Sequence, residues 1–226
     1  MTWLRRAVRL LPIVALFVLG TSCDGFFVSN SSIETVTIGP SAVFLKAGVT
    51  PADSYSTLSF TSLTAGGTKS TDAANASWTS SDTSIATVVA GVLTAGTATS
   101  GTSTITAKDG GTASNACTVV LYTGTAPTTL TVASQTGATA FAAGTFQAIA
   151  SASFAGDTGL SSNITPYVTW SSSDTTGTIA TVNSAGVVTI LSATTPFTIT
   201  ATATFGAAAS PATVTAQQEF NNTTII

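Results

Sequence analysis

The sequence predicts an all-β protein built as two tandem antiparallel β-sandwiches that follow an N-terminal signal segment. Three observations lead to this prediction: a motif that occurs twice, alternation of apolar and hydroxyl residues, and closely spaced turn residues. The motif WTSSDTSIATV begins at Trp78, and WSSSDTTGTIATV begins 92 residues later at Trp170 (170 − 78 = 92). This repeat is too long for a solenoid unit and close to the length of one complete sandwich.

Alternation with period two is typical of strands that bury one face. It is clearest near the end of each repeat, in Thr104–Ala107 and Phe197–Ala203. The first repeat opens with a similar segment, Ile33–Ile38, and the second opens with Thr129–Val132. Turn residues such as Asp109-Gly110-Gly111 separate these runs at roughly the 8–12 residue spacing of a sandwich. No stretch after the leader has sustained helical periodicity.

These features divide the chain into five parts. We expect a signal peptide at 1–22, a tether at 23–32, a first domain at 33–123, a second domain at 124–217 and a C-terminal tail at 218–226. The join lies in the Gly- and Thr-containing stretch Thr123–Pro127. Each domain has about the length of an immunoglobulin-like sandwich, roughly 100 residues.

Composition excludes a disordered polymer and a nucleic-acid-binding protein. Of the 226 residues, 44% are hydrophobic and 7% are charged, against roughly 25% charged residues in ordinary soluble domains. Arg5, Arg6 and Arg9 all lie in the leader, so the rest of the chain carries three Lys against nine acids, a net charge of 3 − 9 = −6. A nucleic-acid-binding protein needs a basic stripe to neutralise phosphates, and this chain cannot form one.

The N-terminal segment MTWLRRAVRLLPIVALFVLGTSCDG has the pattern of an export signal. Its apolar run, Leu10–Gly20, is shorter than the roughly 20 residues that span a bilayer and fits the h-region of a signal. The ending LGTSC resembles the lipobox of bacterial lipoproteins. That resemblance implies cleavage before Cys23 and lipidation of its sulfur. The alternatives are an ordinary cleaved signal and an uncleaved anchor.

The other cysteine, Cys117, lies in the apolar run CTVVL and is expected to be a buried thiol. A disulfide with Cys23 is the alternative, since export would permit it. Two cysteines without histidine cannot form a structural zinc site. We therefore expect no metal centre and no cofactor.

Each repeat resembles the bacterial immunoglobulin-like domain, group 2, which occurs in tandem in intimin- and invasin-type surface proteins. The residues that carry the resemblance are the W-S-S-D and I-A-T-V sequences and the following G-V, here Trp170–Asp174, Ile179–Val182 and Gly186-Val187 in the second copy. The first copy keeps this order and departs by a longer polar insert, Ala65–Ala76. The resemblance implies an antiparallel sandwich with a role in display, spacing or adhesion.

The repeated residues have structural interpretations. Trp78 and Trp170 are expected to be core residues, because a tryptophan on the inner face of a strand buries a large area against the opposing sheet. Asp82 and Asp174 follow serines, a setting in which the carboxylate accepts backbone N–H groups and fixes a turn. Calcium binding by these aspartates is the alternative, although the nine acids are scattered.

Gly91 and Gly186 each precede a short apolar run and are expected to form hairpin turns that need positive φ.

Catalysis is not expected. The chain has no histidine, so it lacks both a Ser-His-Asp triad and a Cys-His pair.

We therefore expect a non-enzymatic, lipid-anchored protein of the bacterial envelope that acts as a structural spacer or display module. Its location would be the outer membrane or cell surface in preference to the inner membrane. The alternative is an adhesin or ligand-binding module that recognises a glycan, a matrix protein or an envelope partner.

Overall fold

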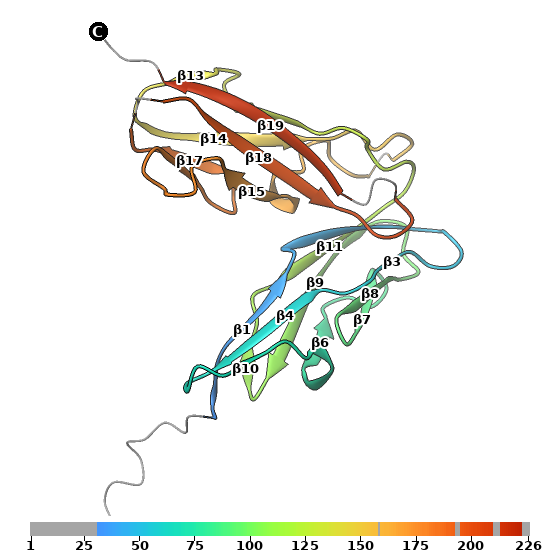
Figure 1. Ribbon diagram of the computed structural model, residues 1–226. Coiled ribbons are helices and arrows are strands. Elements are labelled where there is room, and N and C mark those ends of the chain that lie inside the picture. Colours follow the sequence, from blue (N-terminus) through green and yellow to red (C-terminus); the bar gives the residue numbers. More distant parts are fainter. Residues whose placement is uncertain (1–30, 158, 193–194, 210–212, 223–226) are drawn as a thin grey trace, which may run out of the picture.

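The structure, a computed structural model, describes all residues except 1–30, 158, 193–194, 210–212 and 223–226. These described residues form two β-sandwiches that follow one another end to end (Figure 1). The predicted all-β, two-sandwich fold is confirmed. Cys23 and the predicted signal peptide lie outside the described residues.

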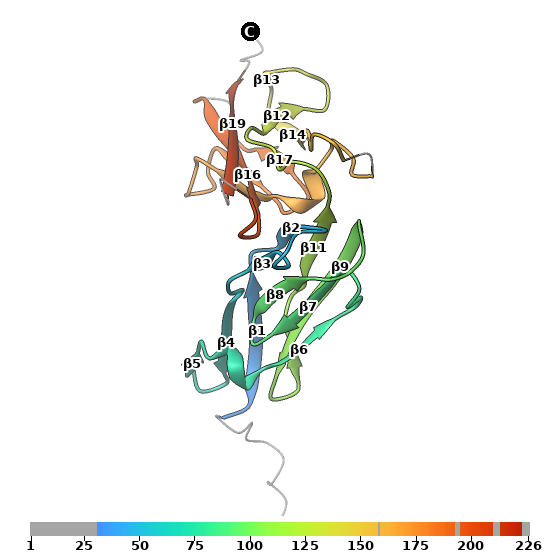
Figure 2. The same cartoon turned by 90° about the vertical axis from the view of Figure 1, so that its right-hand side faces the viewer.

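The first sandwich contains eleven strands and one short 3₁₀ helix. They are β1 (Ile33–Gly39), β2 (Ala42–Lys46), β3 (Ser54–Tyr55), β4 (Ser59–Thr64), β5 (Lys69–Ser70), η1 (Ala73–Asn75), β6 (Ser77–Ser80), β7 (Ala86–Val89), β8 (Val92–Ala95), β9 (Gly101–Asp109), β10 (Thr112–Ala113) and β11 (Cys117–Tyr122). One sheet has the order β10-β9-β11-β2, with β6 paired to β9. The sheets β1-β4-β5 and β3-β8-β7 oppose it across the core (Figure 2).

The second sandwich contains eight strands and a second 3₁₀ helix. They are β12 (Thr131–Ser134), β13 (Ala140–Phe141), β14 (Gly144–Ser151), η2 (Thr165–Tyr167), β15 (Thr169–Ser172), β16 (Ala180–Val182), β17 (Val187–Ile190), β18 (Phe197–Thr204) and β19 (Thr213–Asn222). Its sheets have the orders β12-β14-β17-β16 and β13-β19-β18-β15.

The two sandwiches have related topologies, although β1-β4-β5 and β3-β8-β7 are separate sheets in the first, whereas one sheet, β12-β14-β17-β16, takes their place in the second. In each, a strand near the beginning pairs in parallel with the last strand, β2 with β11 and β13 with β19, whereas the other strand pairs are antiparallel. The tryptophan strands also match, because Trp78 pairs with Ala107 of β9 and Trp170 pairs with Ala201 of β18. The repeated motif therefore lies at the same place in both sandwiches.

The alternation in the sequence produces the cores. In β18, the side chains of Phe197, Ile199, Ala201 and Ala203 are buried, while the threonines between them are half-buried on the opposite face. Burying such apolar side chains stabilises the fold by about 1.5–3 kcal/mol for each large residue. No helix in the described part of the chain is long and apolar enough to cross a membrane.

Candidate functional site

Each tryptophan of the repeated motif packs over a turn of its own sandwich. Trp170 is buried, at 9% exposure, and Trp78 is half-buried against Phe60. The indole Nε1 of Trp78 donates a hydrogen bond to the carbonyl of Ala73 in η1 (2.8 Å). The indole Nε1 of Trp170 donates in the same way to the carbonyl of Thr165 in η2 (3.3 Å). Each ring thus holds the 3₁₀ helix that precedes its strand.

Gly91 and Gly186 lie beneath these rings and have positive φ, at 82° and 79°. A Cβ on Gly91 would lie 3.3 Å from Trp78 Cζ2, and one on Gly186 would lie 3.1 Å from Trp170 Cε2. Glycine is therefore favoured at both positions by the backbone conformation and by the closeness of the indole. The structure brings each tryptophan to its glycine, but the two motifs stay in separate sandwiches and do not converge on one site.

The aspartates of the motif hold the turn before the next strand. Asp174 Oδ1 accepts hydrogen bonds from Thr176 N, Thr176 Oγ1 and Gly177 N, and Oδ2 accepts from Ile179 N (2.6 Å) and Ala180 N (3.0 Å). The hydrogen bonds from Thr176 and from the backbone of Ile179 hold the pKa of Asp174 well below its ordinary value.

Asp82 makes a smaller version of this turn. Its Oδ1 accepts from Ser84 Oγ (2.7 Å) and Ser84 N (2.9 Å), and these bonds lower its pKa. Both carboxylates are therefore engaged in local turns. Among the described residues, no group of three His, Cys, Asp or Glu side chains could hold a metal ion.

Cys117 is a free, fully buried thiol in the core of the first sandwich, and burial raises its pKa to about 12. A thiol with this pKa stays protonated at neutral pH and behaves as a small apolar side chain.

The two sandwiches meet in a joint built around aromatic rings. Phe44 of β2 is fully buried and stacks on Phe205, with ring centroids 5.1 Å apart. It also contacts Phe154 (5.4 Å) and the edge of Tyr167 (6.2 Å). Tyr122 of β11 packs on Phe154 at 5.1 Å. Residues of the first sandwich thus belong to the apolar core of the second.

Backbone hydrogen bonds extend the joint. Gly206 N donates to Phe44 O (2.8 Å), and Ala207 N donates to Ser54 O (2.7 Å). Phe44 and Phe205 form an isolated parallel bridge. The loop after β18 therefore pairs with β2 and with the start of β3, and the two sandwiches are joined by main-chain as well as side-chain contacts.

Asp53 is the polar centre of the joint and is 3% exposed. Its Oδ2 accepts from Lys46 N (2.7 Å), and its Oδ1 accepts from Ser54 N (2.8 Å) and from Ala208 N of the second sandwich (2.7 Å). Gly206 lies so close that an added Cβ would fall 2.6–2.8 Å from the carboxylate atoms. The packing at Gly206 therefore leaves no room for a side chain.

A second carboxylate, Asp157, holds the connecting segment. Its Oδ2 accepts from Thr123 N (2.7 Å), and its Oδ1 accepts from Gly159 N and Leu160 N. Burial raises the pKa of Asp157, but the hydrogen bonds from these backbone groups outweigh burial and lower it. Thr125 N donates to Ala155 O (2.8 Å), so the connection is fixed on both sides of Gly124.

Tyr122 is fully buried in the joint, and its hydroxyl has no hydrogen-bond partner among the described residues. Burial first, and then the nearby Asp53 carboxylate, raise the pKa of Tyr122 to about 12.

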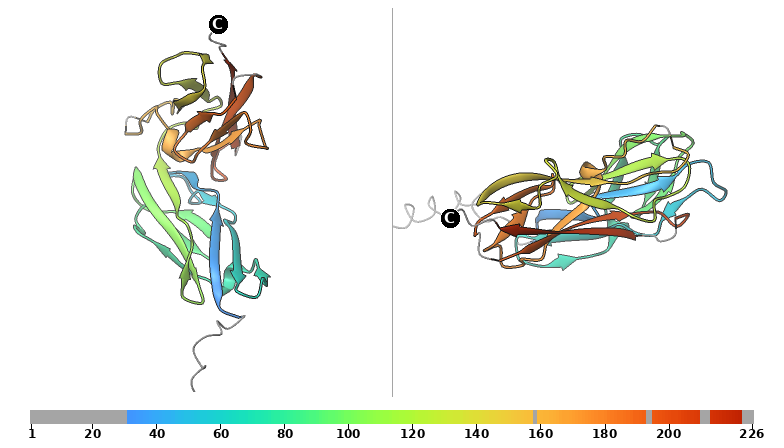
Figure 3. Two further views of the ribbon diagram at one scale, coloured as in Figure 1. Left: turned by 90° about the vertical axis from the view of Figure 1, so that its left-hand side faces the viewer. Right: turned by 90° about the horizontal axis from the view of Figure 1, so that it is seen from above.

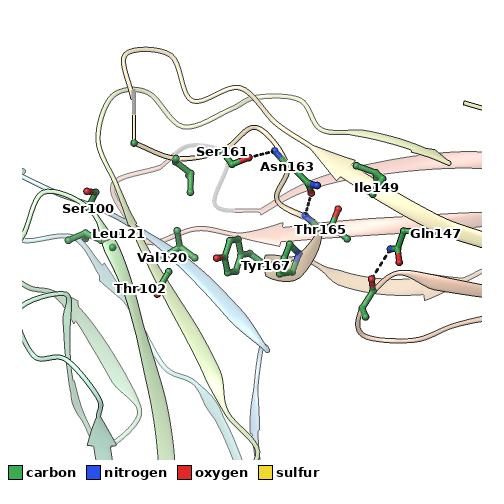
Figure 4. A pocket seen from close by; sticks show the side chains of 15 residues that line it. Ser100, Thr102, Val120, Leu121, Gln147, Ile149, Ser161, Asn163, Thr165 and Tyr167 are labelled. Carbon is green, nitrogen blue, oxygen red and sulfur yellow. Dashed lines mark hydrogen bonds between the residues drawn. The ribbon is translucent and has the colours of Figure 1, made fainter. Parts of the chain in front are cut away.

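Beside the joint lies a groove with a volume of about 640 Å³, and residues of both sandwiches line it. Figure 4 shows the groove between β9 and β11 on one side and the loop 159–167 on the other, with the Tyr167 hydroxyl directed toward Val120. Gln147 and Ile149 of β14 continue its wall. No charged side chain is among the residues that line it.

Sequence reasoning missed the joint and the groove. A usable signal was present in two segments, AVFL of β2 and VVLY within β11, because both are apolar at consecutive positions. A strand that is apolar on both faces is buried on both faces. Val120 and Tyr122 are the outward residues of β11, and the second sandwich covers them.

No family model matches the chain, and no curated protein sequence matches it. Among solved structures, domains 5–6 of the S-layer protein SbsC align at 22% identity over 85% of this chain and 99% of that chain, with a TM-score of 0.34. A C-terminal fragment of intimin, solved with the intimin-binding domain of its translocated receptor, aligns at 19% identity over 84% of this chain and 64% of that chain (TM-score 0.26).

The Yersinia pseudotuberculosis adhesin InvE aligns at 15% identity over 86% of this chain and 62% of that chain (TM-score 0.28). TM-scores of this size carry neither a fold nor a function over to this chain. Its sandwich architecture is shown by its own strand order and register.

Proposed function

We propose that the protein is a non-enzymatic, lipid-anchored component of the bacterial envelope that acts as a rigid spacer and holds its second sandwich in a fixed orientation. In this proposal, both sandwiches are immunoglobulin-like domains of the group 2 type. The first is 33–123, and the second runs from 124 past the expected end at 217, because β19 continues to Asn222. The lipid on Cys23 anchors the chain at the outer membrane or cell surface.

The joint is the observation that carries the proposal. Domains within one chain usually move relative to each other unless their interface is large and apolar. Here the aromatic cluster around Phe44 is continuous with the core of the second sandwich, and backbone groups of 206–208 bind the first sandwich directly. The left view of Figure 3 shows the same end-to-end arrangement from a further direction. A tandem joined in this way acts as one stiff unit.

The non-enzymatic part rests on the side chains that the chain offers. It has no histidine. Four of its aspartates, Asp53, Asp82, Asp157 and Asp174, accept hydrogen bonds from nearby backbone groups. These carboxylates stabilise the fold through their hydrogen bonds. A general acid or base must instead be able to exchange a proton with a substrate, so these carboxylates are poorly suited to that role.

Distance measurements between spin labels test the rigid joint. The full chain with Cys23→Ser serves as the background, and cysteines replace the exposed residues Thr79 and Thr215. Spin labels on these two cysteines report one distance across the joint. Cys117 is fully buried and should stay unlabelled. We expect one narrow distance distribution, which Gly206→Ala broadens because its Cβ displaces the Asp53 carboxylate.

Gly159→Ala is the matched control. Its Cβ would lie 3.6 Å from Asp157 Oδ1, which is an ordinary contact, so the distribution should stay narrow. A broad distribution in the unsubstituted joint would contradict the spacer proposal.

Metabolic labelling with a fatty-acid analogue tests the anchor separately. The full chain should take up label in its bacterial host, and the Cys23→Ala variant should not. Label that persists in Cys23→Ala, or that is absent from both proteins, would show that Cys23 is not lipidated.

A second candidate function, binding of a glycan or an envelope or host protein as an adhesin, is favoured by one specific observation, the groove beside the joint.

A further inference from the structure

We propose that the groove between the two sandwiches is a binding site for a neutral oligosaccharide. The site goes beyond the spacer role and does not depend on the lipid anchor. The argument starts from its volume of about 640 Å³, which lies within the range of roughly 300–1,000 Å³ found for ligand pockets. Such pockets also occur preferentially at the boundary between domains.

The groove offers polar groups that the fold does not use. The Tyr167 hydroxyl, the Thr102 hydroxyl and the Asn163 side-chain NH₂ have no hydrogen-bond partner among the described residues, although Asn163 Oδ1 accepts from Thr165 N (3.1 Å). Gln147 Nε2 donates to Ala148 O (2.7 Å) and Ala185 O (2.9 Å), which fixes the amide and leaves Oε1 available. A ligand with several hydroxyl groups can pair with such a mixed set of donors and acceptors.

The apolar part of the lining suits the faces of sugar rings. Val120 is buried and forms the floor of the groove. The side chains of Ile149, Leu160 and Tyr167 are half-buried around it. Tyr167 presents an apolar ring with a polar tip, and its ring is held in place by the edge contact with Phe44. The site can therefore cover the apolar face of a sugar ring, while its polar groups form hydrogen bonds with the hydroxyl groups of the sugar at the rim.

The absence of charge among the lining residues selects the ligand class. An anionic ligand would gain no ion pair here and would lose its hydration, which disfavours it. A peptide that binds by adding a strand needs a free sheet edge. Strand β11 is flanked by β2 and β9 and offers no such edge. Strand β9 pairs with β6 only from Ile105 onward, so its edge is open only over the short stretch Gly101–Ser103.

A second hollow of about 440 Å³ adjoins the first, because Gln147 lines both. Its lining includes Phe141 and Phe146, whose half-buried rings stack at 4.0 Å, and its lining residues are also uncharged. Two uncharged hollows that share one residue fit a ligand of several sugar units better than a single monosaccharide.

Calorimetric titration of the full chain with chitohexaose, cellohexaose and maltohexaose tests the proposal, with an oligogalacturonate as the anionic comparator. At least one neutral probe should bind, and the anionic probe should not. In NMR spectra of the same titration, the side-chain amide signals of Gln147 and Asn163 should shift when the neutral probe binds. Tyr167→Phe keeps the ring and removes the hydroxyl, so it should weaken binding about 3- to 10-fold.

Thr102→Arg fills the groove and should weaken binding by at least about tenfold. Thr104→Arg is its control, because Thr104 is exposed on the same face of β9 but does not line the groove. The assignment is wrong if no neutral probe binds, or if both arginine variants weaken binding equally. It is also wrong if a neutral Thr- and Gly-rich peptide binds there instead of the sugars.

Discussion

The two tryptophans show how one residue of a repeat can play unequal parts in the two copies. Both indoles hold a 3₁₀ helix through Nε1, but Trp170 is 9% exposed and lies in the main core, whereas Trp78 is half-buried at the edge of its own core. The energetic importance of the motif should follow this difference in burial, since the free energy gained scales with the apolar area removed from water.

Trp170→Ala should therefore destabilise the second sandwich by about 3–5 kcal/mol, the usual loss when a large buried ring is removed. Trp78→Ala should cost about half as much, because a half-buried ring transfers less area from water. Urea unfolding midpoints, followed by circular dichroism, measure both. Equal losses in the two variants would mean that burial does not set the role of the motif.

Asp174 should make the free energy of unfolding depend on pH in the acid range. Its folded pKa is lowered, so its stabilising effect is fully present above the unfolded pKa of about 3.9 and is lost as the pH falls through the lower folded value. Asp174→Asn removes this dependence. The variant should be less stable than the parent at pH 7, and the difference should shrink below about pH 4.

Urea midpoints across this pH range provide the measurement, with Asp82→Asn as the comparison because Asp82 accepts fewer hydrogen bonds. A difference between Asp174→Asn and the parent that stays constant down to the lowest pH would contradict the assignment.

At the scale of elements, the hairpins of the two sandwiches differ in their turns. In β7–β8 the two turn residues are Ala90 and Gly91, both with positive φ (48° and 82°). In β16–β17 the turn is longer, and Asn183 Oδ1 caps Ala185 N and Val187 N (3.0 and 2.9 Å). Only the first hairpin places a residue with a Cβ in the left-handed region, which costs about 1–2 kcal/mol.

Ala90→Asn should relieve this strain and create the Asn-Gly pair that two-residue hairpins prefer. We expect a gain of about 0.5–1 kcal/mol in the free energy of unfolding. Ala185→Asn is the matched control, because Ala185 also precedes the hairpin glycine but does not have positive φ. Thermal or urea unfolding of the two variants gives the comparison, and an equal gain in both would count against strain at Ala90.

The elements themselves could largely be predicted from the sequence. The alternation in Phe197–Ala203 corresponds to most of β18, and the first three residues of each motif fall in β6 and β15. The positive φ of Ala90 could not be predicted from the sequence, because alanine has no local preference for this conformation. Ala90 adopts it here because the strands on both sides of the turn are paired.

At the scale of the whole molecule, local patterns predicted two sandwiches but not how they meet. No local pattern in the sequence marks Asp53, because its partner Ala208 lies 155 positions away. Gly206 likewise has no local signal, because its need for a small side chain arises only from the Asp53 carboxylate opposite. Contacts of this kind depend on the packing of two finished units, and a single sequence does not encode them in any short window.

The walls of the groove come from both sandwiches, and this couples two properties of the molecule. Any ligand that touches both walls binds best to the arrangement in which the joint is closed, so it must also favour that arrangement by the same free energy. A pull along the chain that opens the joint would weaken binding, and an occupied groove would resist the pull. The stiffness of the joint and the affinity of the groove would then depend on the same equilibrium, and a mechanical load on the chain would lower the affinity for such a ligand.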